Sequence, residues 1–193
     1  MSSSDEVRAF IAIELPGAVK SFLKSISDEL KKCGGPVRWV QPEGIHLTLK
    51  FLGSIHAGLL PQIEEAARPL FNKHEPIHLQ VVGLGASPDL KRPRVVWAGL
   101  SDSAGALPPL VNRLENLLEP LGFAKEKRPF NPHLTLGRFK SNERNVDLIE
   151  AIRHKMNIPG PSFVADHVVL FQSILKPSGA EYVQLFRFDC GFA

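Results

Sequence analysis

The tetrapeptide His-Leu-Thr-Leu occurs twice in the chain, beginning once at His46 and once at His133. Apolar and β-branched residues surround both copies, which predicts that each is a β-strand. Because side chains at i and i+2 share one face of a strand, each copy turns its histidine and threonine to one side and its two leucines to a core. If the two polar faces meet, they form a cleft that holds two imidazoles and two hydroxyls.

Two imidazoles facing each other suit acid–base chemistry on a phosphodiester. A neutral imidazole accepts a proton from the attacking oxygen, and a protonated one donates a proton to the leaving oxygen. Histidine serves both roles because its unperturbed pKa is about 6.5. The hydroxyls of Thr48 and Thr135 can donate to phosphate oxygens and stabilise the charge of the transition state. Arg138 adds a guanidinium, but it follows Thr135 by three residues, so a bulge is needed to bring it to the same face.

The motif does not favour a metal site or another cofactor. Its second polar position is threonine rather than a histidine or carboxylate, and the chain contains no HExxH pattern. We therefore predict a reaction without metal. The other histidines lack a paired context and are interpreted as surface or core residues; they are His56, His74, His78, His154 and His167.

The hydrophobic pattern predicts an α+β fold with antiparallel sheets. Helical spacing of apolar residues covers 18–33, 59–71, 107–121 and 146–154. Strands are predicted at 7–15, 37–40, 45–52, 77–84, 94–100, 133–139, 163–174 and 181–189. The repeated tetrapeptide suggests that residues 1–193 form one domain of two related lobes, each of which contributes one motif.

Composition and charge indicate the cellular location of the protein and the charge of its substrate. No segment has the length or purity of a membrane span, and the first residues do not resemble a signal peptide, so we expect a cytoplasmic protein. We also expect it to be a monomer. Cys33 and Cys190 are expected to be reduced thiols. The net charge is +3. Two basic clusters stand out, and they either attract a phosphate-bearing substrate or form a solvated face; they contain Lys91, Arg92 and Arg94, and Lys125, Lys127, Arg128, Arg138 and Lys140.

The chain resembles the 2H phosphoesterase superfamily, which is defined by paired His-x-Thr/Ser-x motifs, and within it the RNA 2′,3′-cyclic phosphodiesterase family, also called the 2′-5′ RNA ligase family. The resemblance covers nearly the whole chain. It is carried by the segments 8–13, 46–53, 93–99 and 132–138, by Trp39, and by Ser173, Leu175, Gly179 and Tyr182. One departure is Ser87, where the family often has an aromatic residue before the proline; we expect it to alter the rim of the substrate site and not the catalytic residues.

The resemblance implies a bilobal fold with pseudo-two-fold symmetry, in which helices pack outside two antiparallel sheets around a central cleft. It also implies metal-independent opening of a terminal RNA 2′,3′-cyclic phosphate to a 2′-phosphomonoester. His46 maps to the proton donor and His133 to the group that activates water. With these roles exchanged, the resemblance implies 2′-5′ ligation of tRNA halves.

Further residues are candidates for substrate binding. Trp39 and Phe51 offer aromatic faces for a terminal base, although both also suit core packing. Tyr182 is expected to line the cleft, and Arg94 to meet the phosphate backbone or to form a surface ion pair. Two other functions remain open: a nucleotide or RNA-end binding module without turnover, and a phosphodiesterase that acts on a small cyclic phosphate.

Overall fold

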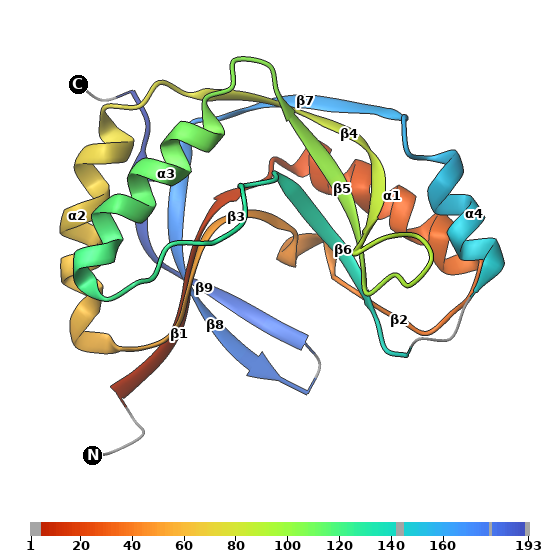
Figure 1. Ribbon diagram of the computed structural model, residues 1–193, viewed down its shortest axis with the longest axis horizontal. Helices are drawn as coiled ribbons and strands as arrows, with labels where there is room; N and C mark the ends of the chain where they lie inside the picture. Colours follow the sequence, from red (N-terminus) through yellow and green to blue (C-terminus); the bar gives the residue numbers. More distant parts are fainter. Residues whose placement is uncertain (1–4, 142–144, 178, 192–193) are drawn as a thin grey trace.

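A computed structural model describes residues 5–141, 145–177 and 179–191. Two antiparallel sheets lie at its centre, and helices cover their outer faces (Figure 1). The first sheet has the order β3 (His46–His56), β1 (Glu6–Glu14), β8 (His167–Lys176) and β9 (Gly179–Asp189). The second has the order β2 (Val37–Trp39), β6 (His133–Phe139), β5 (Val95–Asp102), β4 (Ile77–Ser87) and β7 (Pro159–Ala165). The predicted α+β class with antiparallel sheets is confirmed.

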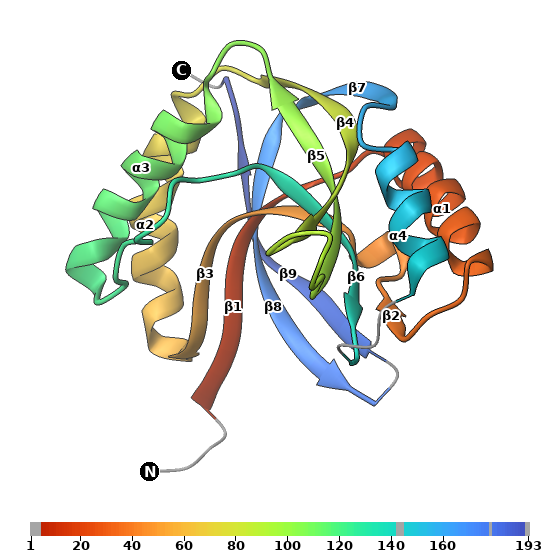
Figure 2. The same cartoon turned by 45° about the vertical axis from the view of Figure 1, so that its right-hand side comes forward.

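Each sheet has its own pair of covering helices. α2 (Leu60–Asn72) and α3 (Leu107–Leu118) pack on the first sheet, through β9 and β3 respectively. α1 (Gly17–Lys32) and α4 (Val146–His154) pack on the second sheet, through β7 and β4 (Figure 2). None of the helices within the described residues combines the length and apolar character that a membrane span requires.

The helices form because their apolar residues recur at a spacing that gives one buried stripe. In α1 the buried side chains include Val19, Leu23, Ile26 and Leu30. Short 3-10 turns complete the connections: Pro42–Gly44, Ala57–Leu59 and Glu119–Leu121. One continuous core contains buried residues from both sheets and all four helices, so neither half of the chain is packed independently of the other.

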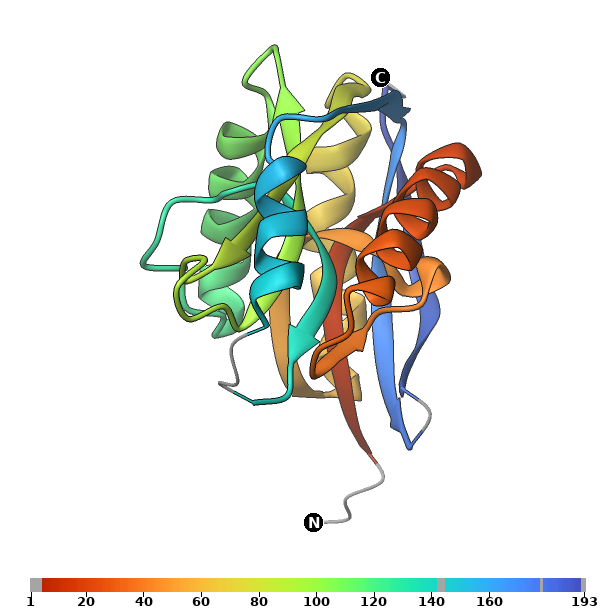
Figure 3. The same ribbon diagram turned by 90° about the vertical axis from the view of Figure 1, so that its right-hand side faces the viewer.

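The prediction of one strand over 163–174 is wrong. The structure divides this segment at Asp166, because β7 pairs with β4 in the second sheet and β8 pairs with β1 in the first. The chain thus passes from one sheet to the other within the segment predicted to be one strand (Figure 3). Side-chain hydrophobicity supports a strand on both sides of Asp166, and it does not indicate which partner each half pairs with.

Candidate functional site

The two motifs lie on strands that contact each other where the sheets meet. His46 and Thr48 belong to β3 of the first sheet, and His133 and Thr135 belong to β6 of the second. β3 and β6 make direct contacts (Figure 1). In both strands the leucines of the motif are buried while the histidine and threonine keep some exposure. We call these four residues the tetrad, and the sheet surfaces that carry them the tetrad face.

Both imidazoles are held in the same way by a carbonyl two residues earlier. His46 Nδ1 lies 2.9 Å from the carbonyl oxygen of Gly44, and His133 Nδ1 lies 2.8 Å from that of Asn131. A carbonyl oxygen accepts hydrogen bonds and cannot donate them, so each Nδ1 carries a proton. Nε2 of each ring is then an acceptor when the ring is neutral and a donor when the ring is protonated. Either histidine is therefore oriented for proton transfer through Nε2.

The two histidines differ in their surroundings. His46 is stacked on Phe10 with a centroid distance of 4.6 Å, and Tyr182 lies perpendicular to it with a centroid distance of 5.1 Å. Burial in this aromatic environment lowers the pKa of His46 to about 4, although the hydrogen bond to Gly44 acts to raise it. His133 is exposed, and its aromatic neighbour is Trp97 at 6.3 Å. At neutral pH the His46 ring is consequently neutral in the free protein.

The threonines complete the tetrad. Thr48 lies opposite Ala12 of β1, and Thr135 lies opposite Trp97 of β5. Their side chains are partly exposed, and within the described part of the chain neither hydroxyl makes a hydrogen bond. Each hydroxyl can therefore donate to an oxygen of an incoming group.

A β-bulge brings Arg138 to the tetrad face. Thr135 lies opposite Trp97, Gly137 opposite Val96 and Arg138 opposite Val95, so Leu136 is left without a partner. Trp97 and Val95 are two residues apart on β5 and share a face, and so do the residues opposite them. Arg138 is thus on the same side as Thr135 and exposed there. The sequence indicated that a bulge was needed, and the register contains one.

A β-bulge in β3 places Phe51 on the tetrad face in the same way. Thr48 lies opposite Ala12, Lys50 opposite Ile11 and Phe51 opposite Phe10, which leaves Leu49 without a partner. The Phe51 ring is 61% exposed and lies 6.3 Å from the Phe10 ring. An aromatic ring this exposed, on the surface that carries His46, offers a face for stacking a base.

Tyr182 of the first sheet is close enough to Arg138 of the second sheet for the arginine charge to affect its pKa. Burial raises the pKa of its phenol, while the positive charges of Arg138 and Arg8 act to lower it. Tyr182 belongs to β9 of the first sheet and Arg138 to β6 of the second, so the two side chains face the same region from opposite sheets.

Two residues that the sequence suggested for substrate binding, Trp39 and Arg94, lie elsewhere. Trp39 is opposite Gly137 and packs against the core, where its ring fills the space that a side chain on Gly137 would occupy. The structure therefore does not bring Trp39 to the tetrad face. Arg94 is exposed just before β5, and with Lys140 it lines a hollow of about 170 Å³ at the end of the strands.

The departure at Ser87 is closer to the tetrad than the sequence suggests. Trp97 Nε1 donates a hydrogen bond to Ser87 Oγ at 2.9 Å. The Trp97 ring also lies against Gly85, where a Cβ atom would be 2.3 Å from it. Trp97 packs beside His133. Ser87 therefore contacts a residue that itself contacts a tetrad histidine.

A buried ion pair joins the first motif strand, β3, to α3 and to the segment that follows it. Lys50 Nζ donates to Glu115 Oε1 at 2.9 Å and to the carbonyl oxygen of Ala124 at 2.6 Å. Glu115 Oε1 also accepts from the backbone N–H of Glu126. The Lys50 and Glu115 side chains are 2% and 8% exposed. This network fixes the segment that leads from α3 to His133, and the sequence did not reveal it because its members are far apart along the chain.

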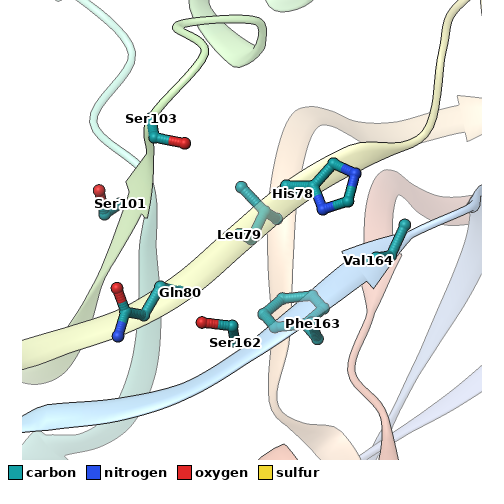
Figure 4. A pocket seen from close by; sticks show the side chains of 8 residues that line it. All are labelled: His78, Leu79, Gln80, Ser101, Ser103, Ser162, Phe163 and Val164. Carbon is teal, nitrogen blue, oxygen red and sulfur yellow. The ribbon is translucent and has the colours of Figure 1, made fainter.

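A larger hollow of about 320 Å³ lies on the second sheet (Figure 4). β4, β5 and β7 contribute its lining, and neither tetrad histidine belongs to it. Gln80 lies opposite Ser101, which is two residues beyond Gly99, the partner of His133. The hollow is therefore an extension of the tetrad face past the His133 end of β6.

Comparisons with known proteins show which family the sequence matches. The model of the 2′-5′ RNA ligase superfamily matches residues 18–175. The RNA 2′,3′-cyclic phosphodiesterase of Methanothermobacter thermautotrophicus is 34% identical over 184 residues, which are 94% of this chain and 99% of that protein. The protein of the same name from Archaeoglobus fulgidus is 33% identical over 183 residues, 95% of this chain and 100% of its own.

Solved structures share the fold of this chain. TT0787 of Thermus thermophilus superposes with a TM-score of 0.79 at 26% identity, covering 94% of this chain and 97% of that one. E. coli LigT complexed with 3′-AMP superposes with a TM-score of 0.74 at 25% identity, covering 96% and 98%.

Proposed function

The chain belongs to the 2′-5′ RNA ligase superfamily, and we propose that it is an RNA 2′,3′-cyclic phosphodiesterase. The resemblance drawn from the sequence motifs is confirmed by the family model and by the relatives. The observation that carries the activity is the pair of histidines on contacting strands, each oriented through Nδ1 so that Nε2 is available for proton transfer. The proposed substrate is an RNA end with a 2′,3′-cyclic phosphate.

The proposed step is an in-line attack of water on the cyclic phosphate. His133 Nε2 takes a proton from the water, whose oxygen forms the new bond to phosphorus. The bond between phosphorus and the 3′ oxygen breaks, and His46 donates a proton to that oxygen. The products are a 3′-hydroxyl and a 2′-phosphomonoester. Thr48 and Thr135 donate to the non-bridging oxygens as negative charge grows on them.

Burial keeps His46 Nε2 without a proton to donate until substrate is present. Its pKa of about 4 leaves it neutral at pH 7 in the free protein. A bound phosphate anion next to the ring favours the charged imidazolium and raises that pKa. We therefore propose that substrate binding itself causes His46 to become protonated. His133, by contrast, is exposed to solvent, and it accepts the proton of the attacking water.

The surrounding side chains supply substrate recognition. We propose that Arg138 donates to phosphate oxygens, that Phe51 stacks a terminal base and that Tyr182 lines the site between them. Attack by a 5′-hydroxyl in place of water would join RNA ends, tRNA halves included, through a 2′-5′ bond. We propose this as a minor reaction because water is in large excess. We also propose that the protein acts as a cytoplasmic monomer.

The test is product analysis with a short RNA that ends in a 2′,3′-cyclic phosphate, incubated with EDTA. We expect conversion to the 2′-phosphate, with a loss of about 10²–10⁴-fold in the His46→Ala and His133→Ala variants. A 3′-phosphate product, or activity lost in EDTA and restored by a metal ion, would contradict the proposed chemistry. Binding of the RNA without turnover would indicate a binding module, and turnover of 2′,3′-cyclic nucleotides alone would indicate a small substrate.

A further inference from the structure

Two arginines lie directly opposite each other at the end of the tetrad face. Arg38 of β2 pairs with Arg138 of β6 in the antiparallel ladder. Residues opposite each other in such a ladder have Cβ atoms about 4.5–5.5 Å apart and point to the same side. Because Arg138 is on the tetrad face, Arg38 is there as well. Both side chains are exposed.

Like charges at opposed positions destabilise a sheet, so this pair calls for an explanation. Among residues 5–141, 145–177 and 179–191, neither arginine forms an ion pair with a carboxylate. Val37 and Trp39, which flank Arg38, both pack on the core side of β2. A bound anion between the two guanidiniums would offset their repulsion.

The position of the pair relative to the tetrad indicates which anion. Arg138 follows Thr135 by three residues, a distance of at most about 10 Å along a strand. Arg38 is on the neighbouring strand β2, opposite Arg138 and therefore level with the end of β6 that is remote from His133. A phosphate held by Thr48 and Thr135 is therefore not the one that Arg38 would meet. An RNA chain has a second phosphate nearby, in the phosphodiester on the 5′ side of its terminal nucleotide.

The opposite end of the tetrad face is less suited to a phosphate. The hollow beyond His133 is lined by eight residues: His78, Leu79, Gln80, Ser101, Ser103, Ser162, Phe163 and Val164 (Figure 4). No lysine or arginine is among them. Because the phosphate backbone dominates the electrostatics of nucleic-acid binding, the arginine end is the favoured exit for the strand.

We propose that Arg38, together with Arg138, forms a second phosphate site that binds the phosphodiester 5′ of the terminal nucleotide. This site rests on the proposed function, and it makes RNA a better substrate than a cyclic mononucleotide. Arg38 is the residue specific to this second phosphate, whereas Arg138 stands between the two phosphates. Guanidinium suits the role because its planar fork donates two hydrogen bonds to a phosphate.

The test compares two substrates, of which only one contains this phosphodiester, together with the adenosine that it joins. 2′,3′-cyclic AMP lacks it, and the dinucleotide ApA ending in a 2′,3′-cyclic phosphate contains it. We expect the native protein to have a lower KM for the dinucleotide. Arg38→Gln should raise that KM by about tenfold, the usual effect of losing a charge-assisted hydrogen bond. The KM for 2′,3′-cyclic AMP should respond much less, so the ratio of the two KM values approaches one.

Arg113→Gln is the matched control, because it removes an exposed arginine from α3 on the outer side of the first sheet; it should leave the ratio unchanged. Calorimetric binding of ApA 2′-phosphate and of 2′-AMP is measured in parallel and needs no turnover. In Arg38→Gln the dependence of log K on log salt concentration for ApA 2′-phosphate should be shallower by about 0.7, the value for one phosphate contact to a single strand.

Equal binding of the two ligands by the native protein, or an equal effect of Arg38→Gln on both, would overturn the second site. Absence of hydrolysis with the expected difference in binding would contradict the proposed function and retain the site. The two failures are therefore distinguishable.

Discussion

The environment of His46 leads to a quantitative prediction about stability and pH. Folding packs its ring against Phe10 and Tyr182 and lowers its pKa to about 4, from an ordinary value of about 6.5 in the unfolded chain. Between these two pH values the unfolded chain binds more protons than the folded protein. Stability from this group is therefore fully present above pH 6.5 and is lost as the pH falls toward 4. The linkage relation gives a loss of about 2 kcal/mol between pH 7 and pH 5.

The assay is urea unfolding of the native protein and of His46→Asn at a series of pH values from 7 to 5. Asparagine keeps an N–H that can donate to the Gly44 carbonyl, and it does not titrate. Other groups titrate in both proteins and cancel in the comparison. The unfolding free energy of His46→Asn should therefore fall less over this range, by about 2 kcal/mol.

Nuclear magnetic resonance observes the ring directly. The imidazole signal that disappears in His46→Asn should titrate near pH 4 in the free protein and at a higher pH with 2′-AMP bound, since the phosphate favours the imidazolium. Parallel stability curves for the two proteins, together with a His46 signal that titrates near 6.5, would refute the reasoning that burial controls this histidine.

Three further predictions concern the support of the site. Lys50→Met leaves the Glu115 carboxylate buried without its cation and should cost about 3–5 kcal/mol of unfolding free energy; the double variant with Glu115→Leu should be more stable than Lys50→Met in the same denaturation assay, and an additive loss would contradict this. Gly85→Ala places a Cβ atom against the Trp97 ring and should cost about 1–3 kcal/mol with a shift of tryptophan fluorescence; an unchanged spectrum would show that the ring does not depend on this contact. Phe51→Ala should change stability by no more than about 0.5 kcal/mol, because the ring is 61% exposed, while the KM for RNA rises about tenfold through lost base stacking; an unchanged KM would remove Phe51 from the substrate site.

The local pattern of the sequence determined which side of each motif strand is polar. Alternation with period two separates His46 and Thr48 from the leucines between and after them, and the same holds for His133 and Thr135. The α+β class and the four main helices follow from spacing along the chain in the same way, since these patterns depend on near neighbours. The tetrad was therefore predictable as two faces, without knowledge of how the faces meet.

Only the tertiary structure decided which other residues share those faces. Leu49 and Leu136 each lack a partner in the ladder, and the change of register that results turns Phe51 and Arg138 toward the tetrad. A bulge is a property of two strands, and its position depends on pairing between segments that are distant in the sequence.

The same reason explains the remaining differences. Trp39 packs on the core because Gly137, its partner on β6, leaves room for an indole ring. The low pKa of His46 requires Phe10 from β1 and Tyr182 from β9 to surround it. The opposition of Arg38 and Arg138 exists only once β2 has paired with β6. The sequence by itself determined the reacting groups and the face on which each lies, and long-range strand pairing decided their burial, their charge and the residues that stand beside them.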